Sequence, residues 1–161
     1  MPAISCARLM RCVLVPAFAF GLGSSPDAYA QCATEAEARK TVAALRQEMA
    51  ELYDAMAASR NALDATLDER AAKLGWNLEK RQAAVVSVMH DQAYASVERT
   101  KFSMLFDVAA AKIEAEQAEE VSNHRATCTA RQKVKLLMLK VVDMDAEQSR
   151  MLLERFRGGV R

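Results

Sequence analysis

Residues 76–121 constrain the fold most, because two opposed apolar faces run along this stretch at helical spacing. At about 100° per residue the two faces lie roughly 165° apart, and charged side chains fill the strip between them. One face comprises Val85, Val88, Phe102, Phe106, Ala109 and Ile113, and the other comprises Val86, Met89, Ala93, Val97, Met104, Val108, Ala111, Ala115 and Ala118. A surface helix needs only one buried stripe. The pattern therefore predicts one long helix packed from both sides, in a bundle or against a partner.

A first long helix is expected before this stretch, over residues 34–74. Thr34 and Glu37 have the spacing of a capping box, in which each side chain satisfies a free backbone amide. Gly75 is the only glycine between Gly23 and Gly158, and a glycine after the last periodic residue ends a helix. Asn77 can then cap the next helix. The two expected helices on either side of Gly75 are similar in length, which predicts an antiparallel hairpin. An unbroken helix through Gly75 is the alternative, since glycine within a helix costs only about 1 kcal/mol relative to alanine.

A third helix is predicted after a second break at Ser122 and Asn123, with candidate caps from Ser122 to Thr129 and a regular apolar stripe from Ala130. Its apolar stripe contains Val134, Leu137, Val141, Met144, Gln148 and Met151. Gln148 either sets the helix register or faces solvent near a frayed end. The fold expected is all-α: an elongated antiparallel helical hairpin or three-helix bundle with coiled-coil character, forming a single domain over residues 31–157. Residues 158–161 are expected to be a disordered tail.

The N-terminus has the pattern of a secretory signal peptide. Arg8 and Arg11 precede an apolar run over residues 12–20, and Ala28 and Ala30 provide the small residues of a signal-peptidase site. The run is too short to span a bilayer comfortably. We therefore expect residues 1–30 to be removed, leaving a periplasmic or secreted protein without stable membrane insertion. An uncleaved anchor and an organellar presequence are the alternatives.

The charge balance argues against a nucleic-acid partner. Residues 1–30 hold two of the 22 Lys and Arg residues and one of the 21 Asp and Glu residues, so the remaining chain carries twenty of each. Nucleic-acid binding depends on a basic surface that displaces counterions. The predicted mature protein, with zero net charge, lacks that excess.

Cys32 and Cys128 are the two cysteines that remain after cleavage, and a disulfide between them suits an oxidising compartment. Two inert thiols in a cytosolic bundle are the alternative. A disulfide requires the chain to turn near Ser122, because a straight helix would carry Cys128 too far from Cys32. His124 lies four residues before Cys128, so Cys32, His124 and Cys128 together form a candidate zinc or copper(I) site.

No motif in the sequence indicates catalysis or a bound cofactor. Residues 24–157 contain a single glycine, Gly75. Both a phosphate-cradling loop and a nucleophile elbow need several glycines, so this part of the chain has neither. We expect a non-catalytic exported protein that acts through protein–protein contacts, as a chaperone-like or assembly factor. The partner is another protein or, as a homodimer, a second copy of the chain. A metal-binding or metal-sensing protein using Cys32, His124 and Cys128 is the second expectation.

Overall fold

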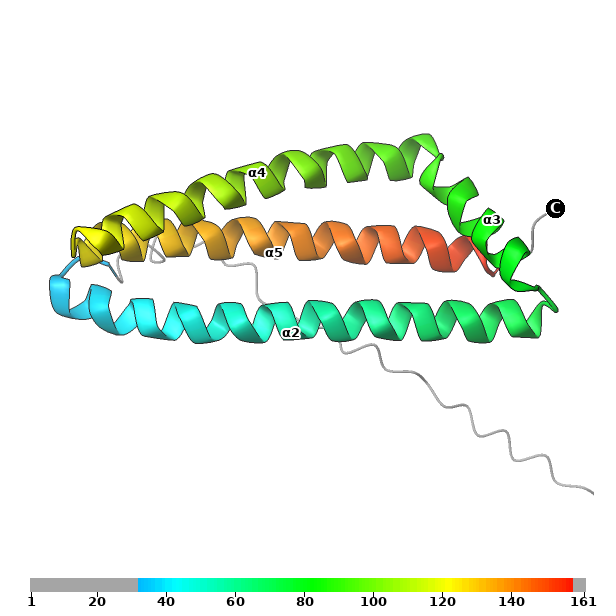
Figure 1. Ribbon diagram of the computed structural model, residues 1–161, viewed down its shortest axis with the longest axis horizontal. Coiled ribbons are helices and arrows are strands. Elements are labelled where there is room, and N and C mark those ends of the chain that lie inside the picture. Colours follow the sequence, from blue (N-terminus) through cyan, green and yellow to red (C-terminus); the bar gives the residue numbers. More distant parts are fainter. Residues whose placement is uncertain (1–31, 158–161) are drawn as a thin grey trace, which may run out of the picture.

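A computed structural model describes residues 32–157, which form four α-helices and no strand. The helices are α2 (Glu35–Lys73), α3 (Leu78–Met89), α4 (Gln92–Glu120) and α5 (His124–Arg155). They pack as an elongated bundle (Figure 1), which confirms the predicted all-α fold. The predicted signal peptide and the predicted C-terminal tail lie outside the described residues. Within the described range, no helix is long and apolar enough to cross a membrane.

Helix α5 lies between α2 and α4 and packs against both (Figure 1). Helices α2 and α5 run in the same direction, and α4 runs back between their two ends. The expectation that residues 76–121 form the helix packed from both sides is therefore wrong. That place belongs to α5, whose buried residues include Val134 and Val141, and also the polar residues Gln132 and Gln148.

The helix ends follow the local sequence signals. The capping box at Thr34 and Glu37 is present, and Gly75 adopts a φ of +66°, in the left-handed region that favours glycine. The Asn77 side chain accepts a hydrogen bond of 2.9 Å from the amide of Lys80 at the start of α3. The second predicted break is also confirmed, with Ser122 at a φ of 54° between α4 and α5.

A further break at His90 and Asp91 was not predicted, so the expected second helix is in fact two helices. Asp91 has an extended backbone, and its carboxylate accepts hydrogen bonds from the amides of Ala93 and Tyr94 at 2.8 and 3.4 Å. It is therefore the N-cap of α4. The break allows α3 to tilt across one end of the bundle, where Figure 1 shows it beside the last turns of α5.

The break also explains why residues 76–121 carry two apolar faces. On α3 the buried residues are Ala84 and Val88, which pack with Leu67, Ala71, Leu152 and Phe156 at the end that α3 closes. On α4 the buried residues are Val108, Ala111 and Ala115, which belong to the opposite face of the sequence pattern. The face that points inward changes from one helix to the next. Helices α3 and α4 are consequently each buried on one side only.

Candidate interaction surface

The apolar face that α4 turns away from α5 is open to solvent. We call the residues Phe102, Phe106, Ala109 and Ile113 the α4 stripe. Their spacing of four, three and four residues places them on one side of the helix. Phe102 is 60%, Phe106 65% and Ile113 54% exposed. In Figure 1 this helix forms one long edge of the bundle, and the exposure of all four residues shows that the other described elements leave the stripe largely uncovered.

Two aromatic rings form the N-terminal half of the α4 stripe. Phe102 and Phe106 are four residues apart, and their rings meet edge to face with centroids 5.1 Å apart at an interplanar angle of 86°. This packing is favourable but leaves most of both rings in water. Exposed Leu105 widens the surface on one flank. A contiguous exposed apolar patch on a small protein is typical of a contact surface.

A polar network beneath this surface connects α4 to α5. The Lys101 ammonium lies 2.5 Å from the side-chain oxygen of Gln148, 2.9 Å from Glu98 and 3.1 Å from Asp145. The Gln148 amide in turn donates a hydrogen bond to Glu98. Gln148 is buried, so it sets the register of α4 against α5 rather than facing solvent. Arg60 of α2 adds a contact of 3.1 Å to Asp145, which brings the third long helix into the network.

The network favours the charged forms of the Glu98 carboxylate and of the Lys101 ammonium group. The hydrogen bonds from Gln148 and then from Lys101 lower the pKa of Glu98 below its ordinary value. Burial alone would lower the pKa of Lys101, but hydrogen bonds and charge from Glu98 and Asp145 outweigh it and raise this pKa. Each of the side chains Glu98, Lys101, Asp145 and Gln148 therefore has at least one polar partner within the network.

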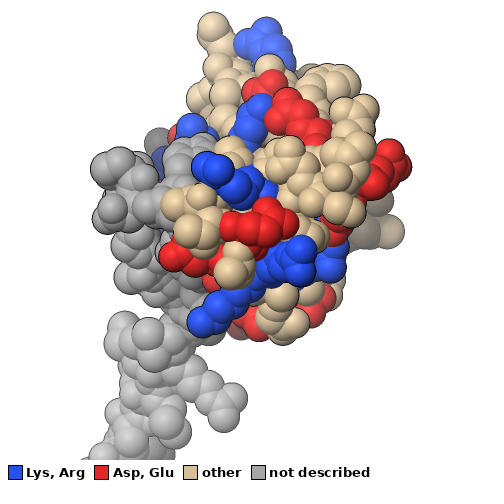
Figure 2. Space-filling model, turned by 90° about the vertical axis from the view of Figure 1, so that its left-hand side faces the viewer, with Lys and Arg blue, Asp and Glu red and all other residues tan. Residues whose placement is uncertain are grey.

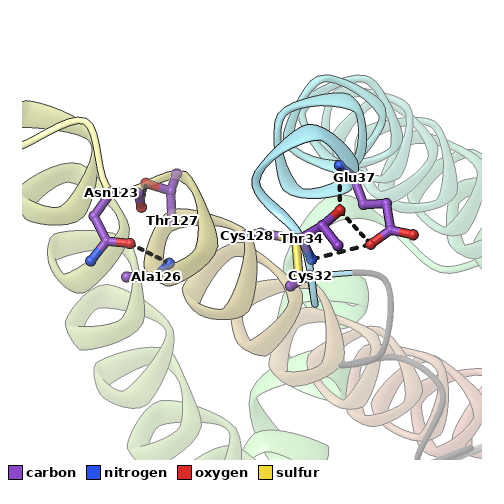
Figure 3. The surroundings of a disulfide bond; sticks show 7 residues. All are labelled: Cys32, Thr34, Glu37, Asn123, Ala126, Thr127 and Cys128. Carbon is purple, nitrogen blue, oxygen red and sulfur yellow. Dashed lines mark hydrogen bonds between the residues drawn. A yellow bond between two sulfur atoms is a disulfide. The ribbon is translucent and has the colours of Figure 1, made fainter.

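At the other end of the bundle, Cys32 and Cys128 form the predicted disulfide (Figure 3), with Cα atoms 5.8 Å apart. The capping box of α2 follows Cys32 directly. Around Cys128, the first turn of α5 is fixed by Asn123, whose side chain accepts from the amide of Ala126 at 3.1 Å. Both sulfur atoms are buried where two helices start side by side. The bridge thus ties the N-terminus of α2 to that of α5.

The disulfide occupies both sulfur atoms of the candidate metal site. The third candidate, His124, lies with its Nε2 atom 3.6 Å from a carboxylate oxygen of Glu35. Within residues 32–157 no cluster of three or more His, Cys, Asp or Glu side chains has the arrangement of a metal site. In this oxidised form, Cys32, His124 and Cys128 do not offer three free ligands.

Positive and negative side chains alternate on the end of the bundle where α2 begins. Figure 2 views this end and shows Lys and Arg beside Asp and Glu, without an extended patch of one sign. Arg131 contacts Glu119 at 2.7 Å, and Arg46 pairs with the same carboxylate from α2. The surface visible here has no continuous basic region of the kind that binds a phosphate backbone.

Comparison of the chain with protein-family models, with curated proteins and with solved structures finds no match. Arguments about function therefore depend on this chain's own residues. Among these, the sequence identified the disulfide pair and the apolar residues of the α4 stripe, although it predicted the stripe as buried. It did not predict the network of Glu98, Lys101 and Asp145. Gln148, a polar residue within an apolar stripe, was the signal for it.

Proposed function

We propose that this protein is an exported, non-catalytic helical protein that acts through protein–protein contacts, as a chaperone-like or assembly factor. The α4 stripe is the observation that carries the proposal. Its two phenylalanines are more than half exposed, although burying each would gain about 2 kcal/mol. A partner that covers the stripe would recover that free energy.

Two features support export to the periplasm or to the extracellular medium. Residues 1–30 have the pattern of a cleavable signal peptide, and the Cys32–Cys128 disulfide is consistent with an oxidising compartment. The intact mass of the native protein tests this part directly, because cleavage after Ala30 leaves Gln31 as the first residue. A mass that retains residues 1–30 would contradict it.

Photo-crosslinking tests the contact surface. A benzophenone amino acid in place of Phe106 keeps an aromatic ring on the α4 stripe, and the same substitution at exposed Ala57 on α2 is the matched control. Irradiation in the native compartment should yield protein adducts from position 106 and few from position 57. The absence of adducts at position 106, with the variant present at wild-type level, would contradict the proposal.

A further inference from the structure

The α4 stripe has charged residues of opposite sign at its two ends. Continuing its heptad spacing by one step gives Arg99 before Phe102 and Glu116 after Ile113. Both side chains are exposed, and neither forms an ion pair within the described part of the chain. They lie on the same face as the stripe, about 25 Å apart along the helix at 1.5 Å per residue.

This order of residues is complementary to itself when two copies of α4 run in opposite directions. With a two-fold axis between residues 107 and 108, Phe102 of each copy lies opposite Ile113 of the other, and Phe106 opposite Ala109. The small Ala109 side chain leaves room for the large ring. Such layers of apolar residues are those of an antiparallel coiled coil.

The same axis also brings the charges into register. Arg99 of each copy faces Glu116 of the other, so the two ends of the interface each gain an ion pair. A parallel pairing would instead place Arg99 against Arg99 and Glu116 against Glu116. Electrostatic complementarity therefore favours a second copy of the chain as the partner, in the antiparallel orientation.

We propose that the α4 stripe is the interface of an antiparallel homodimer, in which Phe102 packs against Ile113 and Arg99 pairs with Glu116. This inference deepens the proposed function and rests on it in one respect, that the stripe is a contact surface. The closed two-fold arrangement uses the stripe of both copies and leaves neither exposed. Each dimer would then be a rod of two bundles joined along α4.

Sedimentation velocity of the purified oxidised mature protein, at concentrations from about 1 to about 200 µM, tests the proposal. We expect a reversible dimer with a micromolar dissociation constant. Phe106→Asp should abolish it, while Ser103→Asp, an exposed position about a quarter-turn from the stripe on the same helix, should leave it within about threefold. A monomer throughout this range, or equal behaviour of the two variants, would overturn the proposal. Circular dichroism checks that both variants keep their helix content.

Charge reversals test the orientation. Arg99→Glu and Glu116→Arg should each weaken the dimer by about tenfold, because two ion pairs become two like-charge contacts. Combining them restores opposite charges across the interface and should return the dissociation constant to within about threefold of wild type. In a parallel dimer the single reversals would change nothing, so three unchanged constants would overturn the antiparallel interface.

The crosslinking experiment separates this inference from the function on which it rests. Adducts between position 106 and a different protein, together with a monomeric purified chain, would refute the homodimer and leave the proposed function standing. The absence of any adduct, together with a monomer, would refute both. Adducts with the mass of two copies of this chain would support the homodimer and the role of the stripe as a contact surface.

Discussion

Lys101 of α4 donates a hydrogen bond of 2.5 Å to the side-chain oxygen of Gln148 on α5, and both side chains are largely shielded from water. The Gln148 amide group donates to Glu98, one turn from Lys101. These contacts fix the register of the two helices, since a shift by one turn would separate all three groups. The orientation of the α4 stripe depends on this register.

Replacing Lys101 with methionine should lower the free energy of unfolding by about 2 kcal/mol, because Gln148 and Asp145 each lose a buried donor. The matched control is Lys133→Met. It removes the ion pair between Lys133 and Glu114, whose charged atoms are 3.2 Å apart and whose side chains are both about half exposed. That change should stay within about 0.5 kcal/mol. Urea unfolding of the two variants measures the difference. Equal effects would contradict the role assigned to the network.

The acid sensitivity of the protein should depend partly on Glu98. Its pKa is lower in the folded protein than its ordinary value of 4.5, so the unfolded chain binds the proton more readily. The stabilisation that charged Glu98 provides is present above about pH 4.5. It is lost as the pH falls through the lower pKa that Glu98 has in the folded protein. Glu98→Gln should therefore show a smaller loss of stability between neutral pH and pH 3, measured by urea unfolding at each pH. An unchanged pH profile would argue against a charged Glu98 in the network.

Reduction of the Cys32–Cys128 disulfide should destabilise the bundle strongly. The bridge joins residues 96 positions apart, and closing a loop of that length is worth about 4 to 5 kcal/mol in the chain-entropy model. We expect dithiothreitol to lower the midpoint of urea unfolding in the wild type but not in a Cys32→Ser/Cys128→Ser variant. On non-reducing electrophoresis the wild type should run as a compact monomer. A covalent dimer band would show that the cysteines pair between chains.

The sequence predicted those parts of the fold that depend on local chemistry. Thr34, Gly75 and Asn77 act through the backbone groups next to them, so their roles could be recognised without the tertiary structure. The break at Asp91 carried the same kind of signal, an aspartate that can cap a helix. It was missed because continuous apolar periodicity on both sides favoured one helix.

The parts that the sequence could not predict depend on which helices pack together. Periodicity shows that a face is apolar but not whether another element of the same chain covers it. Phe106 and Val108 are two residues apart with similar hydrophobicity, yet one is 65% exposed and the other 4%. The network around Lys101 likewise joins residues more than 40 positions apart, which no local pattern reports.

Substitutions at Gly75 should follow backbone preference rather than packing. A Cβ atom added there would meet no atom within 4 Å apart from Gly75 and its two chain neighbours, so only the left-handed conformation resists a side chain. Gly75→Ala should cost about 1 kcal/mol of stability, Gly75→Asn less, and the β-branched Gly75→Val more. Thermal melting of the three variants gives the order. If valine and asparagine were equally tolerated, the α2–α3 connection would not require a left-handed residue.

Truncation of Phe106 and of Val108 should separate a contact surface from a core. Val108 packs against Val134 and Met138, so Val108→Ala leaves a cavity and should lower the free energy of unfolding by about 2 kcal/mol. Phe106→Ala removes a larger side chain but should change the free energy of unfolding by less than about 0.5 kcal/mol, because the ring is already mostly in water. Both are measured by denaturant unfolding at the lowest practicable concentration, where the chain is monomeric. Under these conditions a large loss of stability from Phe106→Ala would mean that the ring is covered by its own chain, and the stripe could not then receive a partner.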